Sequence, residues 1–310
     1  MTIIVIAGGT GGVGRTLVDA FENDGKHTIV VLSRKGGLEL KSGTRLTMVK
    51  VEYTSIASLI DILRAYNIEA VISTLNTFGD NQNELNLISA AEQCSSVKRF
   101  VPSVFGIPYR THHLESYPPA KSNVRAIKTL SETRLEWTAF YIGYFLDYYL
   151  MPKVSSHLKP CPFLVDVENN EAAIPDSGDT PVTFTHSKDV AKMVVASFDL
   201  PTWKRETYAT GDSISYNNLI KVIEDVKGEK MKVTYDSVGK LREGQVTELP
   251  GYQQLYGHIP KPSMDGLISM FALLVAEGDL NLSAKTSLST QYPHVQVTSL
   301  RTWLERAWSE

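Results

Sequence analysis

A glycine-rich turn near the start of the chain limits the possible folds more than any other feature of the sequence. Residues 3–7 are apolar throughout, which is typical of a buried parallel strand, and residues 15–21 then have the composition of a helix. The glycines between them fit two spacings, G-x-x-G-x-x-G and G-x-G-x-x-G, which begin at Gly8 and Gly9 and share Gly11 and Gly14. Such a turn between a strand and a helix predicts a site for the pyrophosphate of a dinucleotide.

Each glycine of such a turn has its own physical task. One allows a sharp turn out of the strand, one lets the backbone approach a pyrophosphate without a Cβ in the way, and one lets the helix pack closely on the strand. The N-terminus of the helix then offers N–H groups and a partial positive charge to the phosphates. We therefore expect the cofactor to be bound by Gly8, Gly9, Thr10, Gly11, Gly12, Val13 and Gly14.

Strand and helix patterns alternate over the first half of the chain. Further strands are predicted at residues 27–33, 46–51, 70–75, 97–103 and 136–143. This alternation is typical of a Rossmann-type, doubly wound parallel sheet in an α/β fold. Beyond Phe145 prolines interrupt short strand-like pieces. We therefore expect an NAD(P)-binding Rossmann domain over residues 1–150 and a smaller C-terminal substrate-binding region over 151–310, partly interleaved with the Rossmann sheet.

Composition and charge narrow the class of partner. The net charge of −3 favours neither nucleic acid nor an anionic membrane, and the two cysteines, Cys94 and Cys161, have no metal-ligand spacing. Because the chain passes directly into the first strand, we expect no cleavable leader. No apolar run reaches the ~18 residues that a membrane span needs. We expect a cytoplasmic protein that binds a small molecule and no metal, with no direct contact to nucleic acid or membrane, and a homodimer is left open.

The end of the second predicted strand indicates which dinucleotide is bound. A site for NAD usually places Asp or Glu here to hold the ribose 2′-hydroxyl group, whereas this chain has Ser33, Arg34 and Lys35. A guanidinium group can bind a 2′-phosphate through charge-assisted hydrogen bonds and can stack on adenine. We therefore predict NADP(H) as the cofactor, bound by Arg34 and Lys35.

The carboxyl ends of the later strands should face the rest of the cofactor. In an open α/β sheet the ligand lies outside these ends, which places Thr74, Leu75, Ser103 and Phe105 near it. Tyr144 follows the sixth predicted strand and is our candidate for a pocket wall near the nicotinamide.

Lys121 and Tyr117 are the predicted catalytic residues. A hydride-transfer site needs a proton donor, and Lys121 is expected on the first turn of the helix after the fifth strand. Tyr117 lies four residues before it, which is the Y-x-x-x-K spacing of short-chain dehydrogenases, and Ser103 lies upstream at a strand end. Because Pro118 and Pro119 suit only the first turn of a helix, Tyr117 is expected just outside it.

Residues 244–262 are predicted to be irregular. They are rich in glycine and proline and include Tyr252, Tyr256 and His258. A long segment of this kind is typical of a binding loop or a lid.

Several motifs together resemble the NmrA-like and isoflavone reductase-like family of atypical short-chain dehydrogenases/reductases, its fungal members in particular. They are AGGTGGVG at 7–14, SRK at 33–35, KRFVPSVFG at 98–106, Lys121 with Val124 and Arg125, GYFLDY at 143–148 and FTHSKDVA at 184–191. The resemblance covers most of the chain and is weakest after about residue 238.

The resemblance implies an NADPH-dependent reductase of a small, aromatic or polyketide-like molecule, acting on a C=O or a C=C bond. In isoflavone reductase-like enzymes a lysine near the start of this helix is the general acid/base. Lys121 matches the fungal K-x-x-V-R form of that pattern, with Lys128 as the alternative. The family's usual Pro-Ser-Glu-Phe-Gly contains Val104 in place of Glu here, which removes a carboxylate from the ligand face.

Two other functions are compatible with the same residues. The chain could be a regulatory protein that senses NADP(H) and has no turnover, or a non-redox isomerase or dehydratase that keeps the cofactor bound. A reductase consumes NADPH, a sensor binds both redox forms without turnover, and an isomerase forms product without net loss of NADPH.

Overall fold

The computed structural model describes residues 1–35, 45–161, 163–256, 260–292 and 294–308. They divide into two compact units, residues 1–141 with 190–209 and residues 142–189 with 210–310. None of the helices in these ranges has both the length and the apolar character that crossing a membrane requires.

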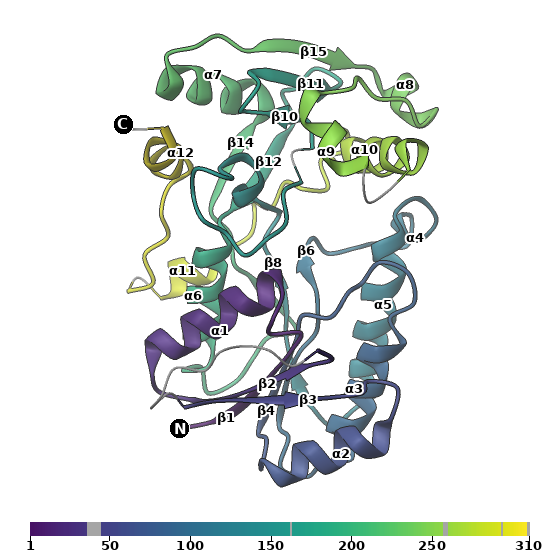
Figure 1. Cartoon of the computed structure of the whole chain (residues 1–310), viewed down its shortest axis with the longest axis vertical. Coiled ribbons are helices and arrows are strands. Elements are labelled where there is room, and N and C mark those ends of the chain that lie inside the picture. The colour runs from purple at the N-terminus through teal and green to yellow at the C-terminus, as the bar shows by residue number, and fades with distance from the viewer. Residues whose placement is uncertain (36–44, 162, 257–259, 293, 309–310) are drawn as a thin grey trace. The chain divides into compact units, whose positions relative to one another are not determined.

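A six-stranded parallel sheet forms the centre of the first unit (Figure 1). Its strands lie in the order β3-β2-β1-β4-β5-β7, so β1 pairs with β2 on one side and with β4 on the other. The strands are β1 (Ile3–Ala7), β2 (Thr28–Ser33), β3 (Leu46–Lys50), β4 (Ala70–Ser73), β5 (Arg99–Val101) and β7 (Glu136–Trp137). The apolar run at the start of the chain is thus the central strand, with Ile4 to Ala7 buried. This confirms the predicted Rossmann-type doubly wound sheet.

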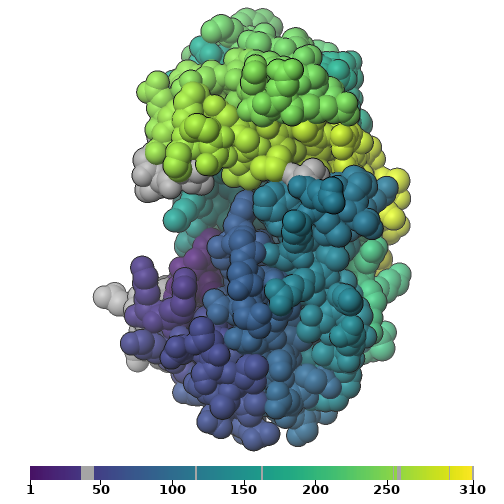
Figure 2. All heavy atoms as spheres, turned by 90° about the vertical axis from the view of Figure 1, so that its right-hand side faces the viewer, coloured from purple at the N-terminus to yellow at the C-terminus, as the bar shows by residue number. Residues whose placement is uncertain are grey.

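Helices cover both faces of this sheet. They are α1 (Gly12–Asp24), α2 (Ile56–Ala65), α3 (Gln82–Glu92), α4 (His113–Ser116), α5 (Pro118–Ser131) and α6 (Ser187–Ser197), of which α6 begins in the second unit and continues in the first. Helix α3 packs against both α2 and α5, and the layer that they form faces the viewer in Figure 2. Phe21 of α1 meets Phe198, just after α6, edge to face with 5.3 Å between ring centroids.

The sixth predicted strand, over 136–143, is wrong as one element. It splits into β7 of the large sheet and β8 (Ala139–Tyr141), which pairs with β6 (Phe105–Gly106) and β13 (Glu206–Tyr208) in a second parallel sheet. The split falls at Thr138, whose N–H donates to Phe100 of the large sheet, whereas the next N–H, that of Ala139, donates to Arg205. The Thr138 hydroxyl also lies 2.8 Å from that of Thr207, which is 69 residues away in the sequence. A local sequence pattern cannot predict a partner at that distance.

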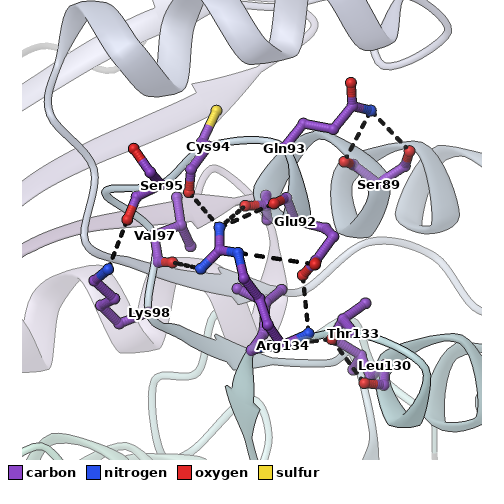
Figure 3. A network of polar contacts seen from close by, with 12 residues as sticks. Ser89, Glu92, Gln93, Cys94, Ser95, Val97, Lys98, Leu130, Thr133 and Arg134 are labelled. Atoms are coloured by element: carbon purple, nitrogen blue, oxygen red, sulfur yellow. Dashed lines mark hydrogen bonds and ion pairs between the residues drawn. The ribbon is translucent and has the colours of Figure 1, made fainter.

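Arg134 fastens the end of α3 to the start of β5 (Figure 3). Its guanidinium group donates to the backbone oxygens of Glu92, Cys94 and Val97 at 2.9, 2.7 and 3.0 Å. The backbone N–H of Arg134 donates to the Glu92 carboxylate at 3.1 Å. The cation therefore satisfies carbonyl groups that a helix leaves unpaired at its C-terminus.

The second unit contains two three-stranded sheets and the C-terminal helices. The sheets have the orders β10-β11-β15 and β14-β12-β9. The strands are β9 (Tyr144–Phe145), β10 (Val165–Asp166), β11 (Glu171–Pro175), β12 (Pro181–Thr185), β14 (Asp212–Ser215) and β15 (Lys232–Asp236). The helices are η1 (Leu146–Tyr149), α7 (Tyr216–Lys227), α8 (Val238–Arg242), η2 (Pro250–Tyr252), α9 (Gln253–Tyr256), α10 (Lys261–Ala276), α11 (Leu288–Gln291) and α12 (Leu300–Trp308). Tyr149, Phe184 and Tyr216 fill the core, and the hydroxyls of Tyr149 and Tyr216 lie 2.8 Å apart.

The irregular segment predicted for 244–262 is wrong for residues 250–256, which form η2 and α9. Tyr252 is completely buried, and its hydroxyl accepts a hydrogen bond from the N–H of Leu164 at 3.3 Å. The contact joins residues 88 positions apart, so a pattern of neighbouring glycines and prolines could not reveal it. His258 lies outside the described residues.

Candidate active site

The glycine turn between β1 and α1 depends on glycine in more than one way. Gly8 has a φ of +80°, and a Cβ there would lie 2.9 Å from the backbone oxygen of Thr74. A Cβ on Gly14 would collide with the oxygen of Gly8 and the hydroxyl of Thr74, and one on Gly9 would lie 2.9 Å from the side chain of Val31. These three glycines are required by backbone conformation and by close packing inside the protein.

Gly11 is the glycine that leaves room for a ligand. It is exposed, and a Cβ there would have no neighbour nearer than the oxygen of Gly8 at 3.9 Å. Gly11 is also the N-cap of α1, and no side chain in the described part of the chain caps that end of the helix. Gly12 and Val13 follow as the first residues of the helix, so their N–H groups suit the oxygens of a phosphate. The turn fits the pyrophosphate of a dinucleotide.

The end of β2 lies beside this turn. The hydroxyl groups of Thr10 and Ser33 are 3.4 Å apart, and the Ser33 hydroxyl accepts a hydrogen bond from the N–H of Lys35. Arg34 and Lys35 are both exposed. The positive charge of Arg34 also acts on the hydroxyl of the buried Tyr53, which donates to the Leu32 oxygen at 3.2 Å. Two exposed cations therefore follow the strand that lines the glycine turn, which is where a 2′-phosphate would need them.

Hydrogen bonds join the ends of β1, β4 and β5. The hydroxyl and the N–H of Thr74 both donate to the Ala7 oxygen, at 2.7 and 2.9 Å. The Ser103 hydroxyl donates to the Leu75 oxygen at 2.7 Å. Thr74 thus fixes the end of β1 from which the glycine turn begins. Ser103 links the carboxyl ends of the neighbouring strands β4 and β5.

Glu84 lies behind these strand ends. It is the third residue of α3 and is 1% exposed, and its Oε1 accepts a hydrogen bond from the N–H of Ser103 at 2.7 Å. Burial raises the pKa of this carboxyl group, although the N–H of Ser103 and the polar side chains of Ser73 and Asn81 act to lower it.

The two predicted catalytic residues begin α5. Tyr117 is the N-cap with extended backbone and Lys121 is the fourth residue of the helix. Tyr117 therefore lies just outside α5, as the two prolines predict. Lys121 is exposed, whereas Tyr117 is half-buried and stacks on Tyr109 with 5.5 Å between ring centroids. Lys128 lies in the last turn of α5, about 10 Å further along the axis and away from the end that carries Tyr117.

The loop after β4 fastens this end of α5 to the sheet. The Asn81 side-chain amide donates to the Ser122 oxygen at 2.8 Å, and the Ser122 hydroxyl donates to the Gly79 oxygen at 3.0 Å. Because Ser122 follows Lys121 directly, these bonds hold the turn that carries the lysine next to the carboxyl end of β4.

Two other predicted residues have packing contacts of their own. Phe105 belongs to β6, and its ring stacks on that of Phe140 at 6.2 Å. Tyr144 belongs to the second unit, where its hydroxyl donates to the Cys161 oxygen at 3.0 Å and its ring lies 4.5 Å from that of Phe271. Burial raises the pKa of Tyr144 well above its ordinary value, so this phenol stays protonated.

The first unit therefore brings the predicted turn, cations, strand ends and α5 residues to one edge of its sheet. Sequence reasoning missed the residues that support this edge, namely Tyr53, Asn81 and Glu84. Asn81 and Glu84 lie at the start of a predicted helix. An acidic residue there is ordinarily explained by its favourable interaction with the helix dipole. A weak signal existed in the Asn-x-x-Glu spacing, but nothing in it indicated burial.

Comparisons with known proteins agree with this geometry. A model of the NmrA-like family matches residues 1–292. "Oxidoreductase BOA1" of Botryotinia fuckeliana is 36% identical over 232 residues, which cover 74% of this chain and 77% of that protein. "Oxidoreductase swnN" of Metarhizium robertsii is 28% identical in an alignment that covers 100% of this chain and 98% of that protein.

Solved structures show the same fold. The complex of leucoanthocyanidin reductase with NADPH from Vitis vinifera superposes with a TM-score of 0.74 at 17% identity, covering 99% of this chain and 100% of that one. At this identity the likeness concerns the fold alone.

Proposed function

Because the chain belongs to the NmrA-like family, we propose that it is an NADPH-dependent reductase of a small aromatic or polyketide-like molecule. The named oxidoreductases among its relatives assign the chain to the oxidoreductases. The NADPH complex of a structural neighbour supports NADP(H) as the cofactor. The observation that carries the proposal is the uncapped glycine turn with two exposed cations at the adjacent strand end.

Each group of residues has a defined task in this proposal. The N–H groups of the turn at 8–14 bind the pyrophosphate, and Arg34 with Lys35 binds the 2′-phosphate. Ser103 and the residues after β4 border the nicotinamide end. Bound NADPH supplies a hydride to the electron-poor carbon of a C=O or C=C bond, and the atom at the other end of that bond then takes a proton. We assign the proton to the ammonium group of Lys121, with Tyr117 beside it as a second hydrogen-bond donor.

Binding followed by turnover tests the proposal. Purified protein is titrated with NADPH and with NADH by fluorescence, and then incubated with a panel of aromatic ketones and enones. We expect tighter binding of NADPH, and products heavier than the substrate by two hydrogen atoms, with one NADPH consumed for each. Equal binding of NADP⁺ and NADPH without any turnover would instead identify a sensor. Product formed without net loss of NADPH would identify an isomerase or a dehydratase.

A further inference from the structure

Glu84 has no role in the proposed reaction, yet its carboxyl group is buried, which is energetically unfavourable. A carboxyl group that is 1% exposed loses almost all of its hydration, and such groups persist in proteins only when hydrogen bonds replace the lost water. Its Oε1 has a short bond of 2.7 Å from the N–H of Ser103. Its Oε2 has no hydrogen-bond partner among the described residues. The groups that act on its pKa, Ser73, Asn81 and Ser103, are all uncharged, so no cation in the described part of the chain compensates an ionised Glu84.

The hydrogen bond from Ser103 to Glu84 fixes one side of the cofactor edge, by which we mean the carboxyl ends of β1, β4 and β5 with the start of α5. Ser103 follows β5, and its hydroxyl donates to the Leu75 oxygen just after β4. With its N–H bound to Glu84 and its hydroxyl bound to Leu75, Ser103 is restrained by two different elements. The carboxyl ends of β4 and β5 therefore keep a fixed separation where the nicotinamide is proposed to lie.

The second side is controlled through Asn81. This residue precedes α3, and its backbone oxygen accepts a hydrogen bond from the N–H of Glu84 at 3.0 Å. Its side-chain amide acts on the Glu84 carboxyl group and also donates to the Ser122 oxygen at 2.8 Å. Ser122 is the residue after Lys121. Glu84 is thus connected to Ser103, just after β5, and through Asn81 to the turn of α5 that carries the proposed proton donor.

We propose that Glu84 is a positioning residue that holds Ser103 and the Lys121 turn in register at the cofactor edge. The inference rests on the proposed function, which it deepens by naming what aligns the donor with the reacting bond. Alignment matters because a displacement of about 1 Å can reduce turnover roughly 100-fold. Glu84 acts through its hydrogen bonds, so an uncharged amide of the same shape should replace it.

Glu84→Leu and Glu84→Gln form the test, with Glu92→Leu as the matched control. Glu92 is on the same helix, but its contacts are with Arg134 at the opposite end. We expect Glu84→Leu to lower kcat roughly 10- to 100-fold with a much smaller change in the Kd for NADPH. Glu84→Gln should restore most of that turnover, and Glu92→Leu should lower the melting temperature with kcat retained. A Glu84→Leu protein that is less stable but keeps the wild-type kcat would overturn the proposal, as would a Gln variant as impaired as the Leu variant.

Backbone hydrogen exchange without cofactor separates this inference from the proposed function. Glu84→Leu should accelerate exchange at Ser103 and in the first turn of α5, whereas Glu84→Gln should not. If the wild-type protein has no turnover, the reductase proposal fails alone and the exchange rates still decide the role of Glu84. Should Glu84→Leu not fold, Asn81→Ala removes the amide that joins Glu84 to Ser122 but leaves the hydrogen bond from the Ser103 N–H to Glu84. We expect this variant to accelerate exchange in α5 and not at Ser103. Unchanged exchange in α5 of that variant would contradict the connection.

Discussion

At the scale of single residues, the glycines of the turn have different structural roles, although the sequence pattern treats them alike. Gly14 and Gly9 pack against neighbouring backbone and side chains, Gly8 adopts a positive φ, and only Gly11 faces open space. The pattern therefore identifies four glycines, and one of them, Gly11, leaves the space that the proposed phosphate site needs. The same distinction holds for Thr74, whose hydroxyl bonds to Ala7 and supports the turn from inside.

Arg34 should determine the preference for NADPH. Arg34→Asp replaces the cation with a carboxylate that repels a 2′-phosphate, and charge-assisted hydrogen bonds of about 1.5–3 kcal/mol correspond to a loss of roughly 10- to 100-fold in NADPH affinity. Fluorescence titration with NADPH and NADH measures the effect. Arg45→Asp makes the same charge change before β3, at the other end of the strands, and should leave the preference intact. An unchanged preference in Arg34→Asp would exclude this 2′-phosphate site.

Lys121 should affect turnover far more than binding. We expect Lys121→Ala to lower kcat roughly 10²- to 10⁴-fold, which is the usual contribution of a general acid, while the protein still binds NADPH. Stopped-flow or steady-state NADPH oxidation with a substrate from the panel measures this. Lys128→Ala is examined in parallel, because a loss of turnover in that variant alone would reassign the proton donor to Lys128.

Glu84 should also give stability a characteristic pH dependence. Because burial raises its pKa, the folded protein holds a proton that the unfolded chain releases above its ordinary pKa, about 4.3. Stability is therefore lost as the pH rises from that value toward the folded-state pKa. Glu84→Gln does not titrate, so we expect its melting temperature to exceed that of the wild type near pH 7 and the difference to shrink toward pH 4. Thermal unfolding followed by circular dichroism measures it, with the exposed Glu132→Gln as control, and a pH-independent difference would refute the explanation.

At the scale of elements, helix ends locate both the site and its support. The N-terminus of α1 is left without a side-chain cap, whereas the C-terminus of α3 is satisfied by Arg134. This difference agrees with the proposed function, because an N-terminus that is to bind phosphate must remain accessible and a C-terminus at the opposite edge of the sheet need not.

Arg134 should contribute to stability without affecting the cofactor. Arg134→Ala removes the guanidinium donor from the backbone oxygens of Glu92 and Val97, and we expect a loss of about 1–3 kcal/mol in the free energy of unfolding. Arg134→Lys should recover only part of it, since an ammonium group cannot reach several carbonyls in one plane. Urea denaturation measures the change, and the Kd for NADPH should stay near that of the wild type. A neutral effect of Arg134→Ala would show that water replaces the guanidinium group.

At the scale of the whole molecule, the course of the chain depends on distant pairings. The chain leaves the first unit after Tyr141 and returns for residues 190–209. The returning segment includes β13, in which Tyr208 pairs with Tyr141 in register. Local composition can indicate a strand of three residues, but it does not show which strand pairs with it.

The sequence by itself determined the parallel sheet, the glycine turn, the cations after β2 and the start of α5. Each of these is encoded in consecutive residues, through an apolar run, a glycine spacing, a basic pair or two prolines. The tertiary structure alone decided that the strand at 136–143 divides between two sheets, that Tyr252 is buried, and that Glu84 lies beneath the strand ends. These features depend on partners far along the chain, such as Asn81 with Ser122 at a separation of 41 residues. Burial and hydrogen bonding of a side chain are properties of its neighbours in space, which a local pattern does not contain.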